Sequence, residues 1–131
     1  MYKLIIDERY TDKGRLESLN EYIRLCRHNK YTANGCIQRD EKAVITAVRH
    51  QLRGLHLEAP VWLHYHFYEW NRLRDWDNVT GYAHKVIQDA LVKAGVLVDD
   101  KPKFVVGFDD YFQYDKKNPR IEVEIEEISN E

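Results

Sequence analysis

The sequence predicts a single α+β domain (mixed α/β) in which helices pack on one mixed sheet. Apolar residues recur with helical spacing in three segments and with strand spacing in four, in the order β-α-α-β-α-β-β. The length of 131 residues suits one core and is too short for two, so residues 1–131 are expected to form one domain. A hydrophobic fraction of 44% is typical of a folded protein.

The N-terminal half is expected to contain one strand followed by two helices. The segment YKLII, residues 2–6, is apolar and favours a strand. Ser18 and Glu21 have the spacing of a capping box, which predicts the start of a helix of about ten residues. A second helix is expected from about Ala33 to Leu52, because apolar residues recur along one of its faces, and Gly54 is expected to end it.

The C-terminal half is expected to add three strands and one helix. After Pro60, the segment VWLHYHFYEW is bulky on both faces, which predicts a central or covered strand. A helix is expected over Val79–Ala94, with Gly81 delaying its start to about Tyr82 and Gly95 ending it. FVVGFDDYFQY and the alternating RIEVEIEEI are expected to be strands, and the DKKNP between them predicts an antiparallel hairpin.

Charge is distributed unevenly along the chain. The net charge is −2, but residues 1–57 carry a net charge of +4 and residues 58–131 a net charge of −6. The basic side chains come mainly from the first two predicted helices. Solvated helix surfaces would explain this pattern, and so would a surface that contacts nucleic-acid phosphates.

Neither a membrane span nor secretion is expected from the sequence. No apolar run approaches 18 residues, and the N-terminal segment lacks the apolar core of a signal peptide. Cys26 and Cys36 lack metal-ligand spacing, so reduced thiols are expected. We therefore expect a cytoplasmic protein with no membrane partner.

Four aspartates stand at the two ends of the third predicted helix. Asp75 and Asp77 precede it, and Asp99 and Asp100 follow it. At an extended strand end, side chains at i and i+2 point the same way, so Asp75 and Asp77 could share a hard cation such as Mg²⁺ or Mn²⁺. A polar turn in which Asp77 or Asn78 caps the helix would explain the same residues. Asp100 could join them if the helix starts late, or it could act across a dimer interface.

A lysine and a histidine pair offer further chemistry. Lys85 could stabilise charge that develops on a phosphoryl group, although an exposed helix lysine needs no such role. His64 and His66 alternate within one predicted strand and could bind zinc or iron together with Glu69. A histidine pair packed under a helix, or beside a phosphate-binding surface, is the alternative interpretation.

Three sequence blocks resemble a known family. RDWDN, KVIQDALVKAG and VLVDD, in this order and at these intervals, resemble the core of the RusA-type Holliday junction resolvases (crossover junction endodeoxyribonucleases), small phage-derived enzymes of bacteria. The resemblance covers Arg74 to about Asp100 and extends loosely to RHNKY and RIEVEIEEISNE. It implies a homodimeric α/β nuclease, bacterial or encoded by a prophage, that cuts four-way DNA junctions with Mg²⁺ in recombination and repair.

The resemblance also implies which residues carry out catalysis. The family's metal-binding aspartates fall on Asp75, Asp77 and Asp100, and the arginine before the first aspartate is Arg74. The family's functional lysine precedes an Asp-Ala-Leu triplet by four residues, as Lys85 does here.

The lysine position departs from the pattern of the compact family members. In those proteins the lysine follows the second aspartate within about one turn, where this chain has Gly81.

Asn78 and Asp99 lie beside the expected ligands and are candidates for orienting them.

The predicted chemistry is phosphodiester hydrolysis by a metal-activated water. One or two Mg²⁺ ions (or Mn²⁺) would activate the water, and Lys85 or Arg74 would offset the added negative charge. The acidic site would repel DNA without metal, so a basic surface is required. The candidates for that surface are Arg24, Arg27, Lys30, Arg39, Lys42 and Arg49. Trp70 and Trp76 could stack on unpaired bases, although core packing is the favoured interpretation of each.

Paired cuts at a symmetric junction require two active sites, which favours a two-fold dimer. Two other functions are compatible with the same residues. One is a catalytically silent, structure-specific DNA-binding dimer, and the other is a nuclease that prefers flaps or forks. No small-molecule cofactor is expected. The sequence leaves open the cleavage preference, the number of metals, and whether Asp100 acts within one chain or across the dimer.

Overall fold

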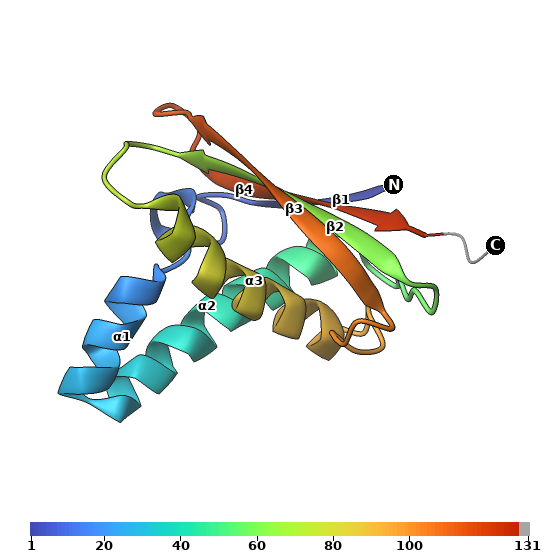
Figure 1. Ribbon diagram of the computed structural model, residues 1–131, viewed down its shortest axis with the longest axis horizontal. Coiled ribbons are helices and arrows are strands. Elements are labelled where there is room, and N and C mark those ends of the chain that lie inside the picture. The colour runs from blue at the N-terminus through green and yellow to red at the C-terminus, as the bar shows by residue number, and fades with distance from the viewer. Residues whose placement is uncertain (129–131) are drawn as a thin grey trace.

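The computed structural model describes residues 1–128, in which α2 and α3 cover one face of a four-stranded mixed sheet and α1 packs against these two helices (Figure 1). The elements are β1 (Tyr2–Ile6), the 3-10 turn η1 (Asp12–Gly14), α1 (Leu19–His28), α2 (Lys30–Gln51), β2 (Val61–Glu69), α3 (Trp76–Lys93), β3 (Val105–Tyr114) and β4 (Arg120–Glu127). The predicted α+β class and element order are confirmed. Residues 129–131, which the family resemblance reached, lie outside the described residues.

The strand order is β1-β4-β2-β3, so β2 is central, as its two bulky faces predicted. β2 pairs in parallel with β3 and antiparallel with β4, and β1 pairs antiparallel with β4. The predicted β3–β4 hairpin is therefore wrong, because β2 lies between the two strands. Residues 115–119 cross the end of β2, where the Asp115 amide donates to the Glu69 carbonyl at 2.8 Å. Five residues easily span two strand spacings of about 4.8 Å each, so a short connection does not establish pairing.

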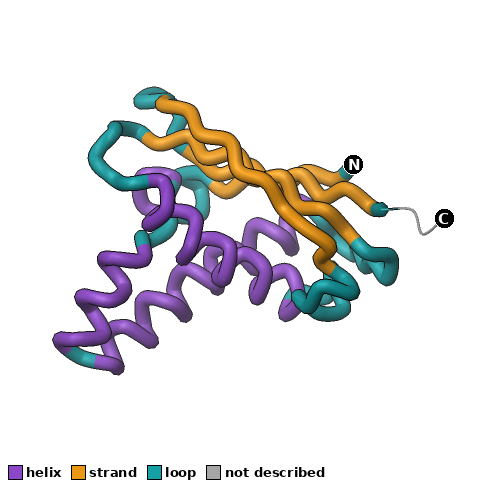
Figure 2. The backbone as a smooth tube through the Cα atoms, viewed as in Figure 1, coloured by secondary structure: helices purple, strands orange, loops and turns teal. Residues whose placement is uncertain are grey.

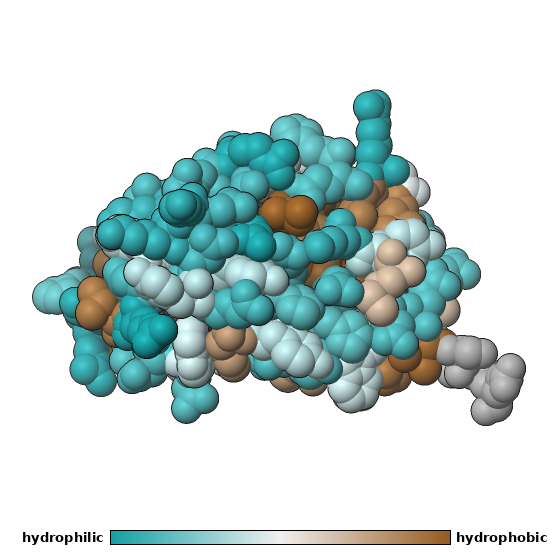
Figure 3. Space-filling view, turned by 90° about the horizontal axis from the view of Figure 1, so that it is seen from above, coloured by the Kyte–Doolittle hydropathy of each residue, from teal (hydrophilic) through white to brown (hydrophobic). Residues whose placement is uncertain are grey.

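The core lies between the helices and the sheet face that they cover (Figure 2). On this face the odd-numbered residues of β2 from Val61 to Phe67 are at most 1% exposed. Ile121, Val123 and Ile125 of β4 are also buried, as the alternation in that strand predicted. The other face of the sheet is not covered by a helix, and Figure 3 shows that it is mainly hydrophilic.

Side-chain caps set the limits of α1 and α2. The Ser18 hydroxyl accepts a hydrogen bond from the Glu21 amide at 3.3 Å, as the capping box predicted. Asn29 ends α1, and its side chain accepts from the Tyr31 amide at 2.8 Å, so it also caps α2. As a result α2 begins at Lys30, a little earlier than predicted.

α3 also begins earlier than the sequence predicted. Asp75 is its N-cap residue and Trp76 its first residue, so Gly81 lies inside the helix instead of delaying it. Gly95 follows the helix with φ +84°, the left-handed conformation that terminates helices, as predicted. Among residues 1–128, no helix is both long and apolar enough to cross a membrane. Cys26 and Cys36 are free thiols, as predicted.

Candidate active site

Asp75 and Asp77 lie at the N-terminal end of α3 and are both exposed. The prediction that they share one side of a strand end is wrong, because β2 ends at Glu69 and Asp77 already belongs to the helix. Asp75 itself keeps an extended backbone (φ −70°, ψ 141°), so the two carboxylates stand at the same end of the helix without sharing a strand. No hydrogen bond or ion pair within residues 1–128 engages either carboxylate group. Both groups therefore face water with their acceptor oxygens unused.

Asp100 lies beyond the other end of α3. The helix has 18 residues, which corresponds to about 27 Å of length. The chain does not return along it after Gly95; Leu57 and Leu97 form a parallel bridge, and β3 starts opposite Val61 at the beginning of β2. Of the two alternatives that the sequence left open, the return of Asp100 to Asp75 and Asp77 within one chain does not occur in this structure. Across the described chain, no three His, Cys, Asp or Glu side chains gather in a cluster that could hold a metal.

Asp99 is engaged locally, whereas Asp100 is exposed. The Asp99 carboxylate accepts a hydrogen bond from the Asp100 amide at 2.7 Å. This bond, helped by Lys101, lowers the pKa of Asp99. Asn78 contacts Asp75 only through the helix backbone, where its amide donates to the Asp75 carbonyl at 3.1 Å.

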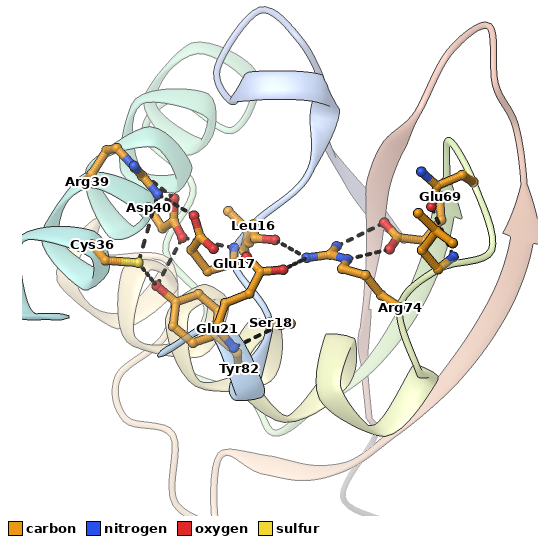
Figure 4. Close-up of polar contacts among 12 residues, drawn as sticks. Leu16, Glu17, Ser18, Glu21, Cys36, Arg39, Asp40, Glu69, Arg74 and Tyr82 are labelled. Atoms are coloured by element: carbon orange, nitrogen blue, oxygen red, sulfur yellow. Dashed lines mark hydrogen bonds and ion pairs between the residues drawn. The ribbon is translucent and has the colours of Figure 1, made fainter. Parts of the chain in front are cut away.

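Arg74 is held in a buried ion pair (Figure 4). Its Nε and Nη2 atoms donate to the two carboxylate oxygens of Glu69 at 2.7 and 3.0 Å, and its Nη1 atom donates to the Leu16 carbonyl at 2.7 Å. The side chains of Arg74 and Glu69 are each 8% exposed. This arrangement anchors the loop after β2 to the segment before α1, and it leaves the guanidinium turned away from solvent.

Lys85 projects from the exposed side of α3. Its ammonium lies 3.1 Å from Asp89 on the next turn, and its side chain is 73% exposed. An exposed pair of this kind stabilises a helix only slightly, by about 0.3–0.5 kcal/mol. The ammonium therefore stays available to a charged ligand.

The six predicted DNA-binding residues are all exposed but are spread along α1 and α2. Arg24 and Arg39 line one groove between these helices, and Arg39 and Lys42 line the adjacent depression. Arg49 lies in a separate depression near the C-terminal end of α2. Arg27 and Lys30 lie on either side of the junction between the two helices.

A polar network fixes the N-terminal part of α3 against α2 (Figure 4). The Tyr82 hydroxyl donates to Asp40 at 3.0 Å, and Asp40 also accepts from the Glu17 amide at 3.1 Å. Arg39 donates to Glu17 at 2.8 Å. A shared hydrogen bond with Glu21, together with burial, raises the pKa of Glu17 to about 7, although Arg39 acts in the opposite direction.

His64 and His66 lie on the uncovered face of the sheet and do not form the predicted metal site with Glu69. Glu69 points to the opposite, helix-covered face, because it is an odd-numbered residue of β2. His64 instead binds Asp109 at 2.7 Å and Glu126 at 2.8 Å. Burial opposes the charge of His64, but these two hydrogen bonds outweigh it and raise the pKa of the imidazole.

The comparison with known families gives one match that covers most of the chain. The family model for endodeoxyribonuclease RusA matches residues 18–126, from the start of α1 into β4. A search of curated proteins found no match. Because the family model covers most of the chain, the protein belongs to the RusA family of endodeoxyribonucleases, enzymes that hydrolyse phosphodiester bonds and resolve Holliday junctions.

Proposed function

We propose that this protein resolves four-way DNA junctions as a two-fold dimer with Mg²⁺ or Mn²⁺ at two shared sites. In each site Asp75 and Asp77 come from one copy, and Asp100 comes from the other. The observation that carries this proposal is the RusA family match, which spans exposed carboxylates at both ends of α3.

The length of α3 supports a site shared between two copies. A helix of about 27 Å keeps its two ends far beyond the few ångströms that separate ligands of one cation. A two-fold axis that sets the α3 helices of two copies antiparallel would place the start of each beside the end of the other. Two such sites, related by the axis, match the two equivalent strands of a junction.

The donor set fits a hard divalent cation. The carboxylate groups of Asp75 and Asp77 are exposed and lack partners within residues 1–128, and the site offers oxygen atoms only. When bound, Mg²⁺ would lower the pKa of the attacking water and polarise the scissile phosphate. The three aspartates would hold the ion and fix the line of attack.

Lys85 is the proposed cation that offsets the charge added to the phosphate, because it is exposed and its pairing with Asp89 is weak. Arg74 is proposed to act indirectly, by anchoring the loop that carries Asp75. The basic side chains of α1 and α2 would bind the backbone of the junction arms without regard to sequence.

Mixed dimers provide the decisive experiment. Asp77→Asn and Asp100→Asn are each expected to abolish nicking of a labelled four-way junction in Mg²⁺. Co-expressed in equal amounts, the two variants should recover about a quarter of the wild-type nicking rate, because half of the dimers then carry one intact site. A site within one chain would give no recovery.

Matched substrates and a chelator complete the test. Linear duplex, flap and fork DNA of the same sequence show whether the junction is preferred. Nicking that persists in chelator would contradict the metal-dependent mechanism. Tight junction binding without nicks in Mg²⁺ or Mn²⁺ would instead leave a silent DNA-binding dimer.

A further inference from the structure

A depression beside Asp75 combines Trp76, a base-stacking candidate from the sequence, with side chains that the sequence did not single out. Arg72 comes from the loop after β2, Trp76 from the start of α3, and Gln113 and Tyr114 from the end of β3. Arg74 and Phe112 complete its lining. Two segments that are distant in the sequence, residues 72–76 and 112–114, thus meet next to a proposed metal ligand.

An aromatic stack leads from the core to this depression. Phe67 is 1% exposed and stacks on Phe112, with ring centroids 5.7 Å apart and planes 17° apart. Phe112 in turn stacks on Trp76, with centroids 4.4 Å apart and planes 22° apart. Trp76, the last ring of the stack, is 38% exposed although it packs on Phe112. The rings below hold the indole in place, so that stacking on it would immobilise no further side chain of the protein.

Arg72 adds a positive charge to the same depression. It is exposed, its guanidinium carbon lies 5.4 Å from the centre of the Tyr114 ring, and no acidic side chain within residues 1–128 pairs with it. Arg74, two residues later, has its charge enclosed by Glu69. The planar guanidinium matches the geometry of a phosphate, and stacking on tyrosine restricts where it can lie.

We propose that this depression is a subsite for one unpaired nucleotide, with its phosphate on Arg72 and its base stacked on Trp76. The proposal deepens the proposed function, on which it rests for its substrate. An arginine and an aromatic ring beside the site are the two groups that bind a single strand without sequence preference. The lining combines polar groups of Arg72, Asp75 and Gln113 with aromatic rings, which suits an occupant that has both a charged part and a planar ring. The subsite would hold a nucleotide from the open centre of the junction beside the scissile phosphate.

Salt dependence tests the phosphate contact independently of catalysis. The probe is a labelled 12-nucleotide single strand. Its Kd is measured at several salt concentrations with Ca²⁺ in place of Mg²⁺, so that a divalent cation offsets the charge of the aspartates. Arg72→Ala should weaken binding and reduce the slope of log Kd against log salt by about 0.7 for each phosphate that the protein no longer neutralises. Arg72→Lys should keep the slope while binding less tightly.

Arg9→Ala is the matched control for the Arg72 variants. Arg9 also lies over a tyrosine ring, at 5.3 Å from the centre of Tyr10, but Asp7 at 3.0 Å already pairs with it. This variant should leave the salt slope unchanged. An unchanged slope in Arg72→Ala, or wild-type protein that does not bind the single strand, would overturn the subsite.

An abasic nucleotide tests the stacking contact. Trp76→Leu retains apolar packing on Phe112 and should weaken binding roughly 5- to 100-fold. An abasic position scanned along the strand should reproduce that loss in wild type at one position, and cause no further loss there in Trp76→Leu. Additive losses at every position would show that Trp76 contacts no base.

Junction cleavage separates failure of the subsite from failure of the proposed function. If Asp77→Asn abolishes nicking while Arg72→Ala and Trp76→Leu cleave and bind like wild type, the function holds and the subsite fails. If wild type nicks no junction but the single-strand results are as expected, the proposed function fails and nucleotide binding stands. Circular dichroism of each variant confirms that it is folded.

Discussion

The two ends of α3 carry similar carboxylates in different surroundings. At the N-terminal end, charged and aromatic contacts hold the chain, namely Arg74 with Glu69 and Trp76 with Phe112. At the C-terminal end the chain turns at Gly95, and the apolar side chains of Val96 and Leu97 are buried. The first end exposes its carboxylates beside a concave surface, and the second exposes Asp100 on a loop. Neither end is a complete metal site, which is why we place the site between two copies.

The largest expected effect separates the two adjacent aspartates at the C-terminal end. Asp100→Asn should reduce junction nicking by more than about 100-fold, because it removes a proposed ligand. Asp99→Asn should cost about 10-fold or less, since Asp99 already accepts the Asp100 amide and at most orients its neighbour. Single-turnover nicking measures both. Equal losses in the two variants would contradict the assignment of Asp100.

The anchor at the N-terminal end should dominate stability. Arg74→Met leaves the buried Glu69 carboxylate without its partner and should lower the free energy of unfolding by about 3–5 kcal/mol in urea titrations. Adding Glu69→Leu removes the stranded charge and should restore most of that loss. The double variant also tests the role of Arg74: if it is folded but cannot cleave, the arginine acts on the phosphate and not only on the loop.

Two separate glycine substitutions test the cap at the C-terminal end of α3. Gly95→Ala forces a side chain into φ +84° and should cost about 1–2 kcal/mol of unfolding free energy. Gly35→Ala within α2 meets nothing within 4 Å and should instead stabilise by about 0.5–1 kcal/mol. Thermal unfolding compares the two. A neutral Gly95→Ala would mean that the C-terminal end of α3 is not held by its cap.

The smallest expected effect is a pH dependence near the N-terminal end. The folded-state pKa of Glu17 is raised to about 7 from an ordinary value of 4.5, so the folded state favours the protonated form. Its contribution to stability is therefore complete below about pH 4.5 and is lost as pH rises through about 7. Glu17→Gln should flatten this part of the stability profile, by about 1 kcal/mol or less after solvent screening. An identical profile in the variant would show that Glu17 does not titrate there.

Local features of the chain were predictable because they depend on neighbouring residues. The Ser18 cap, the termination at Gly95 and the alternation in β4 involve residues a few positions apart, and all three were predicted. Helix starts were less predictable, because a helix can begin at an N-cap residue upstream of a glycine that suggests a later start. Asn29 acted in this way at α2, whereas Asp75 precedes α3 without a side-chain capping hydrogen bond.

By itself, the sequence determined the element order, the one-domain core, the motif residues at the ends of α3 and the family to which they point. Only the tertiary structure decided that β2 separates β3 from β4, that Glu69 neutralises Arg74, and that Arg72 lies with Trp76 and Tyr114. The physical reason is the separation along the chain of the groups that interact. Periodicity and caps depend on neighbours within a few residues, whereas strand pairing and buried ion pairs join groups whose separation in the chain carries no signal of contact.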